Sequence, residues 1–132
     1  MDIDEQQRLG AEIASQAVAL ARASTDLQFD REPGLRERFG ERGVAKSYED
    51  ALHTMRFLAE SVSLGSAATF AGYARWLDDV LLAAHVPPGV LPEHFRILKE
   101  VILLRLSPPA ASQASAALDE ALAVLAEKRS ST

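Results

Sequence analysis

Residues 48–76, YEDALHTMRFLAESVSLGSAATFAGYARW, decide the fold of this chain. They hold two amphipathic helical patterns, which are joined by the corner Leu64-Gly65-Ser66. Gly65 can take the left-handed conformation that ends a helix, and Ser66 can accept a hydrogen bond from the first turn of the next helix. The stretch therefore predicts two consecutive helices, and most of the aromatic side chains of the chain lie on them.

The first of these two helices, which we expect to begin at the N-cap Ser47, has two different faces. Asp50, His53 and Phe57 fall together on one side, at spacings of three and four residues. The opposite side should face the core, because its residues are largely apolar: Tyr48, Leu52, Met55, Ala59 and Val62. Since Phe57 lies opposite this core stripe, we expect the helix to be covered on two sides.

The second helix, expected over residues 67–84, carries a broad apolar arc with Trp76 at its edge. The arc contains Phe70, Tyr73, Ala74, Leu77, Val80, Leu81 and Ala84. Asp78 and Asp79 lie away from it and are predicted to be in water. Adjacent side chains on a helix point about 100° apart, so these two carboxylates do not form a catalytic pair.

The remaining patterns are also helical, and no stretch shows the alternation of a strand. We predict a helix at residues 1–23, a loop with a short helical turn at 24–46, and a helical core at 47–128. Within that core, Pro92 and Pro108 suit the starts of two further helices, of which the first should be the most buried element. The tail from Glu127 is expected to fray. The fold class is therefore all-α, a compact five- to six-helix bundle with a possible globin-like arrangement, in a single domain over residues 1–132.

The composition of the chain argues against several classes of function. The chain has 132 residues, a net charge of -5 and no cysteine, which argues against nucleic acid, disulfides and thiolate metal sites. The N-terminal MDIDEQQ is acidic where a signal peptide is basic, and the longest apolar run, residues 80–84, is far too short to span a membrane. We expect a cytoplasmic protein with no nucleic-acid or membrane partner.

Few residues suggest chemistry. Asp50 and His53 are one turn apart and could form an ion pair, a pH-sensitive contact or a site for an anionic ligand. Tyr73 and Trp76 are neighbours at the edge of the apolar arc, where they could pack in the core, stack on a planar ligand or contact a partner. The three histidines lie on separate elements, and no HExxH, GxSxG or phosphate-binding motif occurs, so we expect neither a metal site nor catalytic residues.

One local pattern resembles histidine phosphotransfer domains, which are helical bundles with an exposed histidine, a following basic residue and a Leu-Gly. The corresponding residues are His53-Thr54-Met55-Arg56 and Leu64-Gly65. The Leu-Gly comes about two residues late, and the bulky Phe57 stands where a small residue is expected. The resemblance would make His53 the phosphorylated residue.

A longer stretch, residues 36–91, resembles the helical segment that precedes the cobalamin-binding module of bacterial cobalamin-binding regulators, and the resemblance covers about residues 30–105. The resemblance rests on Arg38 with Phe39-Gly40, on Asp50, His53, Leu58 and Ala59, and on Phe70, Tyr73 and Trp76. It implies a sensory or assembly domain. The DxHxxG signature of the cobalamin module itself is absent, so the resemblance does not extend to cobalamin binding. A looser similarity, at the level of the fold, is to globin-like bacterial sensor domains, which can lack haem.

Our leading functional prediction is a non-enzymatic helical sensor or dimerisation domain of a bacterial signalling protein. Its partner would be a second copy or another protein domain, docked on the face of Asp50, His53 and Phe57. An alternative is a domain that binds a small, flat, apolar ligand of the tetrapyrrole type near His53, Tyr73 and Trp76. No cofactor is otherwise expected. Histidine phosphotransfer through His53 is the second alternative.

Overall fold

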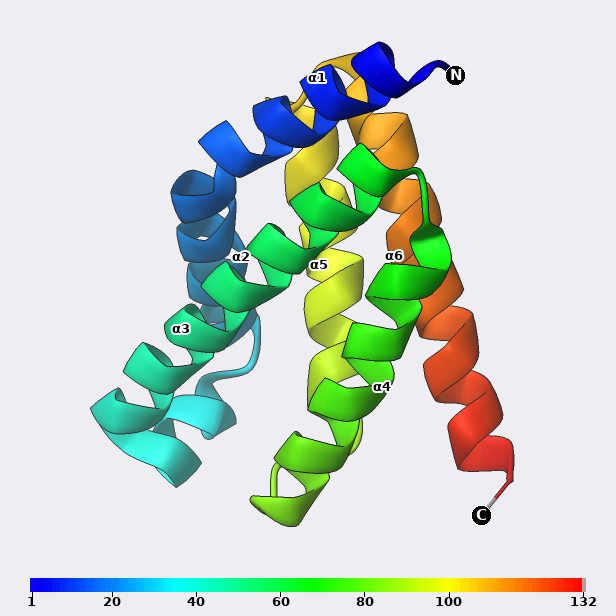
Figure 1. The fold of residues 1–132 in the computed structure, drawn as a ribbon. Coiled ribbons are helices and arrows are strands. Elements are labelled where there is room, and N and C mark those ends of the chain that lie inside the picture. The colour runs from blue at the N-terminus through cyan, green and yellow to red at the C-terminus, as the bar shows by residue number, and fades with distance from the viewer. Residues whose placement is uncertain (132) are drawn as a thin grey trace.

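The computed structural model describes residues 1–131 and shows an all-α bundle with one hydrophobic core (Figure 1). This confirms the predicted fold class. In the described part of the chain there are six helices: α1 (Ile3–Ser15), α2 (Ala17–Arg31), α3 (Pro33–Leu64), α4 (Ala67–Ala83), α5 (Val90–Arg105) and α6 (Pro108–Ser130). None of these helices is long and apolar enough to cross a membrane.

The corner predicted at Leu64-Gly65-Ser66 is confirmed. Gly65 ends α3 in the left-handed conformation, with φ of 66°. The hydroxyl of Ser66 accepts the backbone N–H of Thr69 at 3.3 Å and so caps α4, and the hydroxyl of Ser107 caps α6 in the same way. These ends depend on side chains within three residues of the cap, which explains why the sequence alone was enough to place them.

The predicted loop at 24–46 is wrong over most of its length. α1 and α2 are separate helices that meet at Gln16, and α2 continues through Arg31. Ser24, Thr25 and Gln28 were taken as loop residues because they are polar, yet all three are buried on one face of α2. Gln28 donates its side-chain amide to the backbone oxygen of Val90 at the start of α5, 2.9 Å away. Tertiary packing therefore outweighs the polar composition here.

α3 also begins earlier than predicted. The short helical turn before Gly40 is present, and Gly40 itself is non-helical, with φ of 68°, so a kink separates residues 33–39 from the rest of the helix. The main part of α3 starts directly after this kink, and Ser47 lies inside the helix instead of capping it. Because glycine takes a positive φ without steric cost, Gly40 can change the direction of the chain at a single residue, and the helix resumes directly after it.

The two helices of the 48–76 stretch pack on different neighbours. α3 lies across α1 and α2, whereas α4 runs alongside α6. At the α1–α3 crossing the backbones come so close that a Cβ atom on Gly10 would lie 2.8 Å from the backbone oxygen of Ala59. Figure 1 shows α3 and α4 diverging from their shared corner at Gly65. This divergence positions the candidate site.

Asp78 corrects the prediction for the polar side of α4. Its side chain is 2% exposed, and its two carboxylate oxygens accept hydrogen bonds from Lys128 at 2.7 Å and Arg129 at 3.1 Å. Asp79 is exposed as predicted, although it also contacts Lys128. Lys128 and Arg129 therefore belong to α6 and do not fray; the final residue of the predicted frayed tail, Thr132, lies outside the described residues.

α5 is less buried than predicted. Its residues that face the other helices are fully enclosed, including Phe95, Leu98 and Ile102. Leu103 and Leu104, however, are 68% and 86% exposed near its C-terminal end. The nearly continuous apolar sequence indicated burial all round, but the neighbours of α5 cover only one side of this last turn.

Candidate functional site

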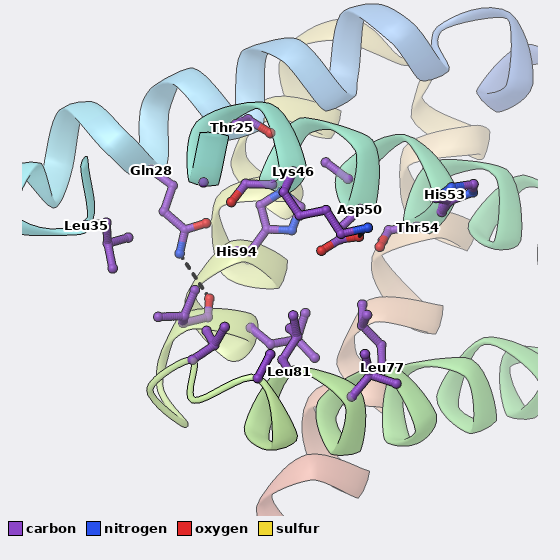
Figure 2. Close-up of a pocket in the computed structure, with 18 of the residues that line it drawn as sticks. Thr25, Gln28, Leu35, Lys46, Asp50, His53, Thr54, Leu77, Leu81 and His94 are labelled. Atoms are coloured by element: carbon purple, nitrogen blue, oxygen red, sulfur yellow. Dashed lines mark hydrogen bonds and ion pairs between the residues drawn. The ribbon is translucent and has the colours of Figure 1, made fainter. Parts of the chain in front are cut away.

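A cavity of about 560 Å³ lies where α3 and α4 diverge. α2 and α5 close it from behind, and the connection between α4 and α5 closes one end. Figure 2 shows this space, with side chains from α2, α3 and α5 on one side and leucines of α4 on the other. A volume of this size falls within the range of about 300–1,000 Å³ that is typical of small-molecule sites.

The α4 wall of the cavity is apolar. Leu77, Val80 and Leu81 line it, and Figure 2 shows Leu77 and Leu81 directed toward α3. Val80 is 43% exposed at the mouth, although the sequence pattern placed it in the core arc. An apolar wall that is open to solvent at one edge favours binding of a molecule with a hydrophobic body, because such a molecule removes this surface from water.

Three aromatic rings stand beside this wall. Phe57 of α3 stacks on Tyr73 of α4 with ring centroids 4.2 Å apart and planes 14° apart, and Trp76 lies 6.0 Å from Tyr73. Tyr73 is buried, and its hydroxyl shares a hydrogen bond of 3.0 Å with the hydroxyl of Thr54. Burial raises the pKa of Tyr73, so the hydroxyl stays protonated. Phe57 and Trp76 remain 44% and 59% exposed and border the cavity opening.

His94 of α5 lies in the opposite, polar wall. Its Nε2 is 3.0 Å from the hydroxyl oxygen of Ser24, and that hydroxyl donates its proton to the backbone oxygen of Ala21. When the Ser24 hydroxyl donates to Ala21, Nε2 carries the imidazole proton and donates it to Ser24, and Nδ1 is then a hydrogen-bond acceptor. Burial lowers the pKa of His94 to about 4, so the ring is neutral at physiological pH.

Asp50 and Lys46, both on α3, are the charged groups of the same wall. The Lys46 ammonium lies 3.5 Å from Asp50 and 3.8 Å from Glu49, and it is largely exposed. Burial raises the pKa of Asp50, and the attraction to Lys46 offsets this only in part. The Asp50 carboxylate is thus partly removed from water and is held by a mobile, solvent-exposed cation.

Thr25 and Gln28 extend the polar wall along α2. Gln28 uses its amide nitrogen on Val90, so its amide oxygen is left as an acceptor. The hydroxyl of Thr25 is buried and has no hydrogen-bond partner among residues 1–131. A buried hydroxyl without a partner costs free energy, and such groups in native proteins call for an explanation.

All five candidate residues from the sequence line this one cavity: Asp50, His53, Phe57, Tyr73 and Trp76. His53 is exposed, and the expected covering of α3 on two sides is incomplete, because Phe57 contacts Tyr73 but stays half in water. Sequence reasoning missed Thr25, Gln28, Lys46 and His94. The signal available was a histidine within an apolar helix, together with polar residues at positions 24, 25 and 28, which share one helical face.

Other kinds of site find no support in the described residues. No group of three or more histidine, aspartate or glutamate side chains within residues 1–131 could hold a metal ion.

No family model matches the chain, and no curated protein matches it significantly. The fold and the cavity together define a helical bundle with a mainly apolar pocket that carries a polar wall on one side.

Proposed function

We propose that this protein is a non-enzymatic helical domain that binds a small, largely apolar molecule in the cavity between α3 and α4. The observation that carries the proposal is the cavity itself, with about 560 Å³ of space between an apolar wall on α4 and a polar wall on α2, α3 and α5. A concave apolar pocket with a few convergent polar groups is the usual form of a small-molecule site.

The contacts of Phe57 favour ligand binding over the dimerisation that we predicted first. Docking of a second copy on the face of Asp50, His53 and Phe57 was expected because Phe57 lay opposite the core stripe. In the structure, Phe57 stacks on Tyr73 of its own chain and borders a cavity. A ligand inserted beside this pair would cover the exposed part of both Phe57 and Trp76, without a partner protein.

Binding would also give the domain a way to respond. α3 packs mainly on α1 and α2 and α4 mainly on α6, so a ligand that contacts both α3 and α4 would bias the angle between these two helices. A sensor domain works in this way, and the resemblance to the helical segment of cobalamin-binding regulators points in the same direction. The ligand-binding and sensor functions are therefore parts of one proposal.

The test is a pair of neighbouring substitutions on α4. Leu81 lines the cavity, whereas Leu82 points elsewhere and is 37% exposed. We expect the neutral probe N-phenyl-1-naphthylamine, excited above the absorption of tryptophan, to bind saturably to the wild type and to Leu82→Trp. Leu81→Trp should weaken binding by about tenfold or more, because the indole fills the space that the probe occupies.

Thermal unfolding of both variants serves as the control for folding. Equal binding by the two variants, or no saturable binding by the wild type, would contradict the proposal. The absorbance spectrum of the purified protein, before and after addition of haemin, separately tests the tetrapyrrole alternative.

A further inference from the structure

We infer that the ligand of this cavity is an amphipathic cation, an organic ammonium with an apolar body, whose charged end binds at Asp50. The inference rests on the proposed function and adds the chemical class of the ligand. It follows from which hydrogen-bonding groups remain available in the polar wall, from the aromatic rings at the opening and from the balance of charge.

The polar wall presents acceptors close to its one negative charge. A carboxylate such as that of Asp50 is an acceptor only. Gln28 presents its amide oxygen, and His94 presents Nδ1 as an acceptor in the tautomer that donates its ring proton to Ser24. A ligand end that donates several hydrogen bonds fits such a wall, and an ammonium donates up to three.

The charges favour a cation over an anion. Apart from the histidines, the lining residues include two side chains that can carry a charge, Asp50 and Lys46. The Lys46 nitrogen lies 3.5 Å from an Asp50 carboxylate oxygen, and this distance makes a loose ion pair. Lys46 is 69% exposed, whereas Asp50 is 24% exposed, so the negative group is the one that belongs to the cavity. A ligand ammonium could replace Lys46 at the carboxylate, and Lys46 would then turn into solvent or toward Glu49, 3.8 Å away. An anion would instead meet Asp50 at close range.

The aromatic rings add to the preference. Phe57 and Trp76 border the opening, and both contact the buried Tyr73, with ring centroids 4.2 and 6.0 Å from the Tyr73 centroid. The faces of aromatic rings attract cations, and aromatic cages bind quaternary ammonium groups in proteins. The chain as a whole carries a net charge of -5, which favours the approach of a cation.

Three probes with the same body and different ends test the inference. 6-Phenylhexylamine carries an ammonium at neutral pH, 6-phenylhexanol is neutral, and 6-phenylhexanoate is an anion. Each is titrated against the wild type that is loaded with N-phenyl-1-naphthylamine. We expect the amine to displace the probe at about tenfold lower concentration than the alcohol, because a charge-assisted contact with a partly buried carboxylate is strong, and the hexanoate to be weakest.

Asp50→Asn and Glu49→Gln form the matched pair of variants. Both residues contact Lys46, but only Asp50 lines the cavity. Asp50→Asn should weaken the amine by about tenfold, leave the alcohol nearly unchanged and strengthen the hexanoate, since the negative charge that repels it is removed and Lys46 keeps only the exposed contact with Glu49. Glu49→Gln should change each probe by less than about twofold, as expected for an exposed pair. Lys46→Gln should strengthen the amine.

The outcomes separate the two proposals. Preferential binding of the hexanoate, or an amine affinity that Asp50→Asn leaves unchanged, overturns the cation inference. If the alcohol still binds and Leu81→Trp still blocks it, the ligand-binding function stands. If none of the three probes displaces N-phenyl-1-naphthylamine, the cation inference fails, and the ligand-binding function fails as well only if N-phenyl-1-naphthylamine itself does not bind saturably.

Discussion

Two regions of the bundle that contain buried polar side chains differ in how completely these groups are paired. At the α4–α6 contact, both carboxylate oxygens of Asp78 are paired, one with Lys128 and the other with Arg129. In the cavity wall, Asp50 has one exposed cation, and the buried hydroxyl of Thr25 has no partner within the described part of the chain.

This difference separates a structural role from a binding role. Buried charge is tolerated where the protein itself supplies the counter-charge, and Asp78 meets that condition. A polar wall that the protein leaves incomplete, next to empty space, is one that a bound molecule can complete. The comparison predicts that substitutions at Asp78 affect stability, whereas substitutions at Asp50 affect chiefly what binds.

The largest expected effect concerns His94 and the pH dependence of stability. The folded protein lowers the pKa of His94 from 6.5 to about 4. The unfolded chain therefore binds more protons between these two pH values, and the free energy of unfolding falls as the pH drops through this window. The loss from this group should reach about 3 kcal/mol at pH 4.

Urea unfolding of the wild type and of His94→Gln, from pH 7 to pH 4, measures this effect. The variant should lack the part of the pH dependence of the free energy of unfolding that comes from His94. It should keep the parts that come from other groups, including the opposite effect of Asp50, whose raised pKa favours the folded state as the pH falls. Parallel pH profiles for the two proteins would show that His94 is charged in the folded state or is not buried.

The next prediction concerns the stability that the buried cluster of Asp78, Lys128 and Arg129 contributes. Asp78→Asn should lower the free energy of unfolding by about 2 kcal/mol, because it weakens charge-assisted hydrogen bonds to two cations in a buried position. Asp79→Asn, at the neighbouring residue, removes only an exposed contact with Lys128 and should cost less than about 0.5 kcal/mol. Equal costs in urea unfolding would mean that the burial of Asp78 contributes nothing.

The smallest expected effect is the change in stability on replacing two buried threonines, Thr54 and Thr25. Thr54 shares a hydrogen bond with Tyr73, so Thr54→Val should destabilise the protein by about 1 kcal/mol. Thr25→Val removes a buried hydroxyl without a partner and should stabilise it by about 1 kcal/mol. Thermal unfolding of the two variants gives the signs directly. A destabilising Thr25→Val would indicate that this hydroxyl makes a contact in solution, and the cavity wall would then be as complete as the Asp78 cluster.

Much of the fold could be predicted from the sequence because it depends on local chemistry. The corner at Gly65, the caps at Ser66 and Ser107 and the kink at Gly40 each follow from a few neighbouring residues. The errors concern the start of α3 and the exposure of Leu103 and Leu104, and a further group concerns buried polar residues. Ser24, Thr25 and Gln28 were assigned to a loop, and Asp78 was assigned to solvent, because nothing near them in sequence reveals their partners.

The candidate site shows the same division. The five residues chosen from the sequence all line one cavity, since they cluster on two adjacent helices. Their counterparts on α2 and α5 were missed, because His94 and Gln28 are separated from them by long stretches of chain and show no motif.

Local sequence was sufficient to predict that the chain is helical, where α4 and α6 begin, where α3 ends and which faces of the central helices are apolar. These properties come from hydrogen bonds and steric preferences within a turn or two of helix. Only the tertiary structure decided that α3 packs on α1 and α2 while α4 packs on α6, and this divergence leaves the cavity between them. The packing of the helices also sets which buried polar groups are paired, because partners such as Asp78 and Lys128 lie far apart in the sequence.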